Sequence, residues 1–289
     1  MKKETLSLGM AAVFLAAFHA SAAPGPLHSA KVTEIRHEVR LQEKNLPAGP
    51  TAGLDPSPYR DPTKAPTRQA AVGDLIQGGR LLRTGKDSRA ELLFNDNTIA
   101  RLGANSIFTF RRDSRNVHLS SGFVLLHTPK GNGGASVTTP TATAAVLGTT
   151  IMLSVLADGS VKLVNLEGTS MLSFQGQTQT LQPGQLCIYT PGQGISLPTT
   201  INLKRLVETS AMLKSFRGSL GSERLIQEAI DAQQLLLSSG QLSITGDEKG
   251  LQFVTDSGAA SAIQSQSQPP PSNSPPSPPS GNQGGGPDK

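Results

Sequence analysis

A mainly β protein is the fold class that this sequence predicts. Between Ala71 and Leu197, short runs rich in aliphatic and β-branched residues recur about every 8 to 12 residues, and Gly, Asn, Asp or Pro separates them. That spacing is typical of a sandwich, a barrel or a solenoid. No helical pattern is interleaved with these runs, which argues against an architecture of alternating strands and helices. We therefore expect a β-domain over residues 71–197.

The clearest local pattern is a β-hairpin. Ala90, Leu92 and Phe94 fall on one face of an extended strand, because alternate residues of a strand share a face. Asn95-Asp96-Asn97 supplies the chemistry of a turn, and Thr98 to Leu102 returns as a second strand.

The rest of the β-domain is predicted to consist of many more short strands. They are expected near residues 72–76, 80–83, 106–110, 117–119, 122–126, 136–139, 142–147, 150–156, 160–166, 170–174, 178–181 and 186–190. Gly148 interrupts the most apolar window, Ala144 to Ala157, and predicts a buried bend between two buried strands. Trp is absent and aromatic residues make up 4% of the chain, which excludes a large aromatic core.

The first 22 residues predict a secretory signal peptide. Lys2 and Lys3 precede an apolar run, Leu8 to Phe18, and the small residues Ala20 and Ala22 suit cleavage after Ala22. A membrane anchor is the alternative, but the run has about ten residues where a membrane-spanning helix needs about 20. No later segment has the pattern of a membrane span. We therefore expect a periplasmic or secreted mature chain without a transmembrane helix.

Residues 23–70 predict an N-terminal strand and a proline-rich linker. Val32, Ile35 and Val39 stand among charged residues, which fits one exposed strand or two short strands, but the same spacing also fits a helix. The segment Leu46 to Arg68 contains six prolines. Because proline has no backbone N–H, this segment is expected to be an extended insertion or linker.

After the β-domain, residues 200–240 predict a helical hairpin. Apolar residues recur at helical spacing from Leu203 to Phe216 and again from Leu225 to Leu237, and Gly240 fits a C-cap. The hairpin is expected to cap the β-domain or to pack on itself. A dimeric coiled coil is the alternative, but the heptad pattern is not sustained.

The C-terminal part of the sequence predicts disorder. Leu251 to Val254 has the pattern of one more strand, but residues 257–289 are mostly Ser, Gln, Pro and Gly. Such a composition cannot bury enough apolar surface to order the chain, so we expect a disordered tail.

No catalytic, cofactor-binding or metal-binding motif is recognisable in the sequence. His118 and His127 lie on separate expected strands, and no G-x-S-x-G sequence provides a nucleophile elbow. The spacings H-x-x-x-H and C-x-x-C are absent as well. The single cysteine, Cys187, lies in a strand-like run and excludes an intramolecular disulfide, and a buried apolar role is expected for it. We therefore expect a protein without enzymatic activity and without a cofactor.

Basic residues slightly outnumber acidic ones, with a formal net charge of +5. They form no run of the kind that binds nucleic acid, so no nucleic-acid partner is expected. The densest group is Arg111, Arg112 and Arg115, in the expected turn between two strands. One interpretation is a solvated turn that protects a sheet edge. The functional alternative is an anion-facing patch for a glycan, another anionic polymer or lipid phosphate.

A series of short motifs runs through the β-domain in a particular order. In its first half they are Val72 to Ile76, Leu82 to Gly85, Asp87 to Leu92 and Asp96 to Gly103. In its second half they are Leu119 to Gly122, Val137 to Ala142, Val146 to Thr150, Leu166 to Gly168 and Leu181 to Gln185. By their order and spacing, these motifs resemble the FecR domain family, the iron-dicitrate sensor family. The resemblance covers roughly Ala71 to Leu197.

The resemblance implies a fold and a role. The fold is a β-solenoid or a twisted, sandwich-like β-domain, and residues 30–42 are then more consistent with strand than with helix. In the family's iron-uptake members, the domain lies outside the membrane, receives a signal from an outer-membrane transporter and passes it through a membrane helix to a cytoplasmic anti-sigma segment. The present sequence shows neither that helix nor that segment.

These observations together predict a stand-alone, non-enzymatic FecR-like module of the bacterial cell envelope. Its expected role is protein binding or sensing, with an envelope protein of unknown identity as its partner. A structural or polysaccharide-associated envelope protein is the alternative.

Overall fold

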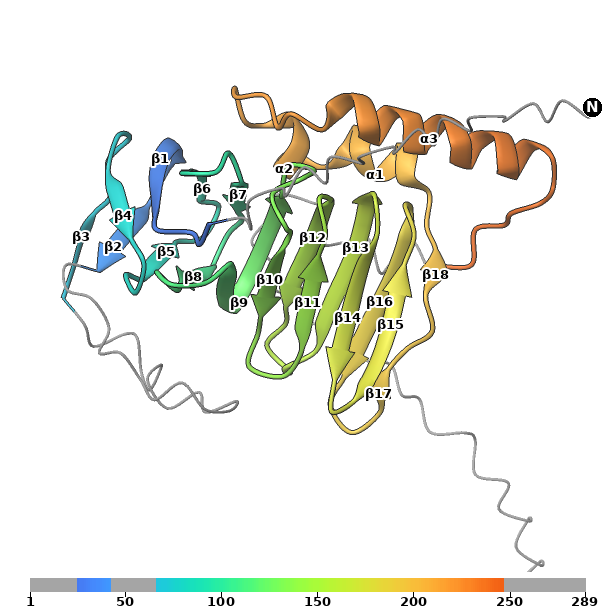
Figure 1. Cartoon of the computed structure of the whole chain (residues 1–289), viewed down its shortest axis with the longest axis horizontal. Helices are drawn as coiled ribbons and strands as arrows, with labels where there is room; N and C mark the ends of the chain where they lie inside the picture. Colours follow the sequence, from blue (N-terminus) through green and yellow to red (C-terminus); the bar gives the residue numbers. More distant parts are fainter. Residues whose placement is uncertain (1–24, 43–65, 247–289) are drawn as a thin grey trace, which may run out of the picture. The chain divides into compact units, whose positions relative to one another are not determined.

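The computed structural model describes residues 25–42 and 66–246, which form two β-sheets packed face to face and a layer of helices on one of them (Figure 1). The chain divides into two units, Met1–Gly258 and Ala259–Lys289, and all described residues belong to the first. Several predictions fall outside the described residues: the signal peptide with cleavage after Ala22, the linker over residues 43–65, the strand at residues 251–254 and the tail at residues 257–289.

Sheet A carries the helical layer on its outer face. In order of pairing, its strands are β4 (Leu75–Gln77), β1 (Ser29–Arg36), β6 (Arg89–Phe94), β7 (Ile99–Leu102), the second half of β9 (Asn116–His127), β12 (Thr150–Val155), β13 (Val161–Glu167) and β16 (Gln185–Thr190). Two short strands, β17 (Gly194–Ile195) and β18 (Thr199–Thr200), also pair with β16. These pairings are antiparallel throughout.

Sheet B lies opposite sheet A. Its strands are β3 (Thr67–Gln69), β2 (Val39–Gln42), β5 (Leu82–Thr84), β8 (Ile107–Phe110), the first half of β9, β10 (Ala135–Thr138), β11 (Thr143–Val146), β14 (Ser170–Phe174) and β15 (Gln177–Leu181). From β10 onward the chain forms one hairpin in each sheet in turn: β10–β11 in sheet B, β12–β13 in sheet A and β14–β15 in sheet B. Among the described strands, only the β9–β10 pair is parallel.

Strand β9 belongs to both sheets. Its first half pairs with β8 and β10 in sheet B, and its second half pairs with β7 and β12 in sheet A. The change of sheet falls at Gly122, whose φ is +84°. A Cβ atom at this position would lie only 2.5 Å from the Cα atom of Ser106. Glycine alone combines this backbone conformation with the absence of a side chain, so the crossing requires it.

The main core lies between the two sheets and is mostly aliphatic. Leu119 and Leu126, from the two halves of β9, are both fully buried in it. The rings of Phe94 and Phe110 meet edge to face with 5.0 Å between their centroids. Cys187 is also buried in this core, where burial raises the pKa of its thiol. The expected role of Cys187 as a small buried residue agrees with this position.

Strands β12 and β13 are buried on both of their faces. One set of alternate residues enters the core between the sheets, and the other set, which includes Met152 and Val164, packs against the helices in a second apolar cluster. Every residue of both strands is therefore buried. This double burial explains why apolar residues occupy both faces of these strands, so that the sequence shows no strict alternation.

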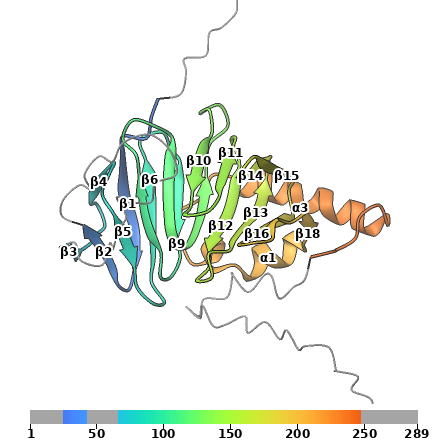
Figure 2. The ribbon, with the colours of Figure 1, turned by 90° about the horizontal axis from the view of Figure 1, so that it is seen from below.

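The helical layer consists of α1 (Leu203–Thr209), α2 (Ala211–Lys214) and α3 (Glu223–Ser238). In Figure 2, α1 and α3 lie beside β13 and β16. The helix expected from Leu203 to Phe216 is interrupted, because Ser210 has an extended backbone between α1 and α2. Gly240, with φ +73°, follows α3 within the hydrogen-bond pattern of a Schellman motif. None of the described helices has both the length and the apolar character that a membrane span requires.

The mainly β fold class predicted from the sequence is confirmed. Residues 29–36 and 39–42 are strands rather than a helix, and His37, with φ +61°, lies between them. The two strands expected at residues 117–119 and 122–126 are one strand, β9, because Gly122 redirects the strand without ending it. The pairings are those of a sandwich of alternating hairpins, and the parallel coils of a regular solenoid are not seen among the described strands.

Replacement of Gly122 by alanine is expected to destabilise the protein strongly. The variant combines an unfavourable positive φ with a Cβ clash against the Ser106 backbone, and we expect a loss of at least about 2 kcal/mol in the free energy of unfolding. Gly176→Ala is the matched control, since Gly176 has φ +82° but no atom within 4 Å of the added Cβ. Urea denaturation compares the two variants. Equal losses of unfolding free energy in the two variants would show that the close approach of Gly122 to Ser106 has no energetic importance.

Candidate functional site

His127 lies in a buried polar cluster beneath the start of α3. Its Nδ1 atom is 2.9 Å from the Thr150 hydroxyl, which also contacts Glu167 Oε1 at 2.9 Å and Ser222 Oγ at 2.8 Å. Burial lowers the pKa of His127 and raises the pKa of Glu167. Ser222 is the N-cap residue of α3, but its side chain makes no capping bond and points to the sheet instead. The cluster therefore fastens α3 to sheet A.

His118 is on the other sheet and has a different environment. Its Nδ1 atom is 3.1 Å from the Thr138 hydroxyl of the neighbouring strand β10. Burial lowers the pKa of His118 to about 4, so the ring is neutral at neutral pH. Because His118 pairs within sheet B and His127 within sheet A, the structure does not bring the two histidines together. Residues 25–42 and 66–246 contain no group of three or more His, Cys, Asp or Glu side chains arranged to hold a metal ion.

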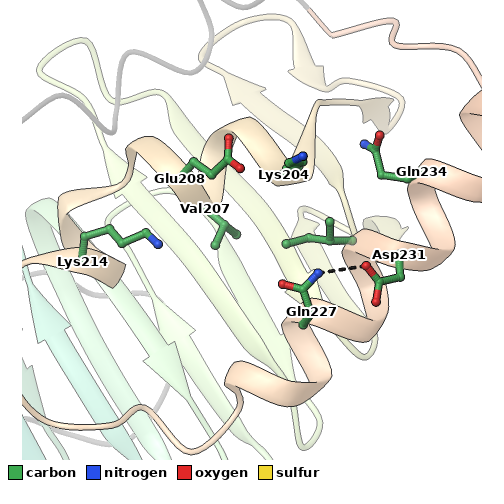
Figure 3. A pocket seen from close by; sticks show the side chains of 8 residues that line it. Lys204, Val207, Glu208, Lys214, Gln227, Asp231 and Gln234 are labelled. Carbon is green, nitrogen blue, oxygen red and sulfur yellow. Dashed lines mark hydrogen bonds between the residues drawn. The ribbon is translucent and has the colours of Figure 1, made fainter.

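A cleft of about 250 Å³ lies in the helical layer (Figure 3). Its lining includes the apolar side chains of Val207 and Ile230, and the remaining lining residues are Lys204, Glu208, Lys214, Gln227, Asp231 and Gln234. Gln227 donates a hydrogen bond of 2.9 Å to Asp231. Two lysines and two carboxylates balance each other, so the cleft concentrates neither sign of charge.

The three arginines of the candidate anion-facing patch are not equivalent. Arg115 is engaged inside the fold: it donates hydrogen bonds to the Asp96 carboxylate, to the Gly134 carbonyl oxygen and, at 2.9 Å, to the Gly25 carbonyl oxygen. Asp96 in turn accepts a bond from the Thr98 N–H and so shapes the predicted turn at residues 95–97. Arg115 therefore joins two turns and a distant segment of the chain.

Arg111 and Arg112 are exposed, and Arg112 contacts β4. The Nη2 atom of Arg112 donates a hydrogen bond of 2.8 Å to the Gln77 side chain of that strand. Gly78 permits the contact, because a Cβ there would lie 2.4 Å from the Arg112 backbone nitrogen. Two of the three predicted arginines are therefore exposed, and one of them, Arg112, lies at the end of sheet A that β4 forms.

A buried ion pair covers the middle of the outer face of sheet A. Arg101 Nε donates to Glu91 Oε2 at 2.8 Å, and both side chains are almost fully buried. The same guanidinium group donates to the carbonyl oxygens of Met212 and Gly218 and lies 4.8 Å from the centroid of the Phe216 ring. Breaking such a pair leaves an uncompensated buried charge, so it holds the segment after α2 firmly on the sheet.

Beyond that segment, the β4 end of the outer face of sheet A exposes apolar side chains. Leu75 is 59% exposed and pairs across strands with Lys31, which is also exposed. Val72 is 62% exposed in the turn before β4. We name Lys31, Val72, Leu75, Gln77 and Arg112 the β4 surface.

The turn that carries Val72 is held in place by Asp74. The Asp74 carboxylate accepts two hydrogen bonds from Arg68, at 2.8 and 2.9 Å, and one of 2.8 Å from the backbone N–H of Ala71. The bond from Arg68 lowers the pKa of Asp74. Gly73, with φ +96°, closes the turn. Val72 of the β4 surface is therefore presented on a turn that these bonds hold in place.

Sequence reasoning missed the β4 surface, although a signal for it exists. It placed a strand at residues 72–76, whereas β4 starts at Leu75 and Val72 precedes it in a turn. The Gly73-Asp74 pair between two large apolar residues is turn chemistry, and it could have located that exposed turn. The partners of Arg101 were missed as well, because Met212 and Gly218 are more than a hundred residues away in the sequence.

The fold defines a two-sheet β-domain with a helical layer. Residues 80–170 match the family model described as FecR protein. The resemblance predicted from the sequence is thereby confirmed over the segment from Arg80 to Ser170, which spans β5 to the start of β14. No curated protein matches the chain.

Among solved structures, two crystal structures of a candidate anti-sigma factor from Parabacteroides distasonis ATCC 8503 are similar to the chain. The first has 16% sequence identity and a TM-score of 0.40, and the similarity covers 44% of this chain and 62% of that one. The second has 15% sequence identity and a TM-score of 0.40, and the similarity covers 45% of this chain and 64% of that one. The chain therefore spans a little under two thirds of the length of these relatives.

His118 is expected to make stability depend on pH. Its pKa is about 4 in the folded chain against 6.5 for an ordinary histidine, so the unfolded chain binds a proton first as the pH falls. The contribution of His118 to the free energy of unfolding is present above pH 6.5 and is lost as the pH falls to about 4. The loss is at most about 3 kcal/mol.

The measurement is urea denaturation of the native chain and of His118→Gln between pH 7 and pH 4. The variant should lose less stability over this range. His28→Gln, at an exposed position, is the control and should follow the native chain. Parallel pH profiles for the native chain and His118→Gln would contradict the assignment.

Proposed function

We propose that this chain is a non-enzymatic, FecR-like protein-binding module of the bacterial cell envelope with a sensor role. The main structural support for this proposal is the β4 surface. It exposes Val72 and Leu75 at the end of sheet A, next to basic side chains and beyond the segment that Arg101 holds on the sheet. Single exposed apolar residues are common on protein surfaces, but two of them, on β4 and on the turn before it, beside exposed cations suit a protein partner.

The chemistry of the surface favours one kind of partner. Lys31, Arg111 and Arg112 are exposed bases, and Asp74, the nearest acidic residue in sequence to Leu75, is already paired with Arg68. A partner segment that presents an apolar side chain between carboxylates would complement both features. Rim charges of this kind mainly raise the association rate and select the partner, while the apolar contact supplies the affinity.

The family match and the N-terminal sequence support a location in the envelope. FecR domains of iron-uptake members act outside the cytoplasm, and residues 1–22 have the pattern of an export signal. An outer-membrane transporter and a membrane-bound regulator are therefore the partner classes that we propose.

A binding role also agrees with the engagement of the titratable groups. His127 and Glu167 hold α3 on sheet A through Thr150, and His118 joins two strands of sheet B. A catalytic pair needs groups that reach a substrate, and these side chains are buried or half-buried within the sheets.

Removal of the exposed apolar side chains is expected to abolish partner capture. The experiment is a crosslinking pull-down from intact envelopes with the chain that lacks the predicted signal peptide as bait, in native form and as Val72→Ser/Leu75→Ser. We expect at least about a tenfold loss of the captured partner, because two apolar contacts are removed. Arg111→Ser/Arg112→Ser should reduce capture less and should weaken its dependence on salt.

The matched control is Leu147→Ser, which changes a side chain of similar exposure, 60%, on the loop after β11. It should capture the partner as the native chain does. Recovery of an outer-membrane transporter or a membrane regulator would support the sensor role. Capture that is equal for the native chain and the β4 variant would contradict the proposal.

Association with polysaccharide is a second candidate function, and the outer face of sheet B favours it. A row of neutral polar side chains crosses five neighbouring strands there: His118, Thr138, Thr143, Ser173 and Thr178. Strands β10, β11, β14 and β15 contain no charged residue. Hydroxyl groups both donate and accept hydrogen bonds, which suits the hydroxyl groups of a glycan.

Co-sedimentation with purified cell-wall polysaccharide tests this second function. Thr143→Val/Ser173→Ala removes two hydroxyl groups from the row, and the binding constant should fall by about tenfold or more. Thr209→Val, on the exposed side of α1, is the control and should bind unchanged. Equal sedimentation of all three proteins would remove the polysaccharide hypothesis.

A further inference from the structure

The outer edge of sheet B ends in a strand without a charge, a proline or a bulge to oppose pairing. Strand β15 (Gln177–Leu181) pairs with β14, and no other described strand shares a register with it. It is five residues long, whereas β3 and β4 have three residues each. Its sequence, QTQTL, contains no charge and no proline, and its register with β14 has no bulge. Sheet edges normally carry at least one of these devices against association.

The geometry of the β14–β15 hairpin shows which backbone groups face outward. Gln175 and Gly176 form a two-residue turn with φ values of +44° and +82°, which is the type I′ geometry. The flanking residues, Phe174 and Gln177, are then a hydrogen-bonded pair, and bonding to β14 continues at every second residue. Thr178 and Thr180 therefore direct their N–H and C=O groups away from β14, and both residues are exposed.

We propose that β15 is a self-association edge at which two copies of this chain pair their β15 strands antiparallel about a two-fold axis. With the axis at Gln179, Thr178 of one copy lies opposite Thr180 of the second copy. The outward groups of the two residues then form four backbone hydrogen bonds, and sheet B continues from one copy into the other.

The β15 edge is complementary to the same edge of a second copy. A two-fold axis at Gln179 places this residue opposite its own copy, so a charge there would meet the same charge. Neither β14 nor β15 carries a charge, and no like charges meet in this pairing. On the outer face Thr178 and Thr180 of the two copies alternate, and β-branched threonine suits such cross-strand pairs. An edge selected for a foreign basic or acidic strand would show the opposite charge, and β15 shows none.

The test measures self-association of the full chain without the predicted signal peptide by analytical ultracentrifugation over a concentration series. The native chain should shift from monomer to dimer as its concentration rises. Thr180→Pro removes an outward N–H that has no partner in β14, so the hairpin should persist. Two of the four intermolecular hydrogen bonds are lost, and the dimerisation constant should fall at least about tenfold.

A charge variant provides an independent readout. Gln179→Lys places two ammonium groups opposite each other on the two-fold axis and should weaken the dimer, with partial recovery at high salt. Thr143→Lys introduces the same charge on β11, inside sheet B and away from its edge, and should dimerise as the native chain does. Urea denaturation of each variant checks that the fold is retained.

Three results would overturn the proposal. The first is a native chain that remains monomeric at all concentrations. The second is a dimer that Thr180→Pro and Gln179→Lys leave unchanged, because such a dimer uses another surface. The third is a monomeric chain that binds a different envelope protein in a manner abolished by Thr180→Pro, since the edge would then accept a foreign strand. None of these results depends on the β4 surface, so this test is separate from the proposed function.

Discussion

The passage of β9 from one sheet to the other is the constraint on which the rest of the structure depends. One continuous strand supplies neighbours to sheet B in its first half and to sheet A in its second half. Because its backbone runs against Ser106 at Gly122, the two sheets are held face to face at the separation that the aliphatic core fills. The later hairpins extend each sheet from the pairing edges that β9 provides.

The crossing also determines which surfaces are available for binding. Sheet A is covered by sheet B on one face and, over most of the other, by the helices, which Arg101 and the His127 cluster hold in place. Three of the surfaces left uncovered in the described part of the chain are the β4 surface, the outer face of sheet B and the edge of β15. The protein-binding hypothesis concerns the β4 surface, the polysaccharide-binding hypothesis concerns the outer face of sheet B, and the self-association hypothesis concerns the edge of β15. Each hypothesis can therefore be contradicted without the others.

Local sequence chemistry predicted most of the strands, because turn residues and alternation act over a few positions. The hairpin around Asn95-Asp96-Asn97 and the bend at Gly148, with φ +62°, are found as expected. Sequence reasoning could not predict contacts between distant positions. Arg115 was expected in a solvated or anion-facing turn, but Asp96 and Gly134 engage it. A turn and a strand look alike at residues 72–76, since both contain apolar residues at short spacing, and the β4 surface was missed there.

The most direct test of this account is amide hydrogen exchange on the native chain, resolved by peptide. The central claim is that the helical layer is part of the same folded unit as the sheets, so that the outer face of sheet A is unavailable except at β4. Buried amides of α3 should then exchange only through the same opening as those of β12 and β13, with similar free energies. Exchange of α3 at a much lower opening free energy than β12 and β13 would contradict the account, because the face beneath it would then be accessible to a partner.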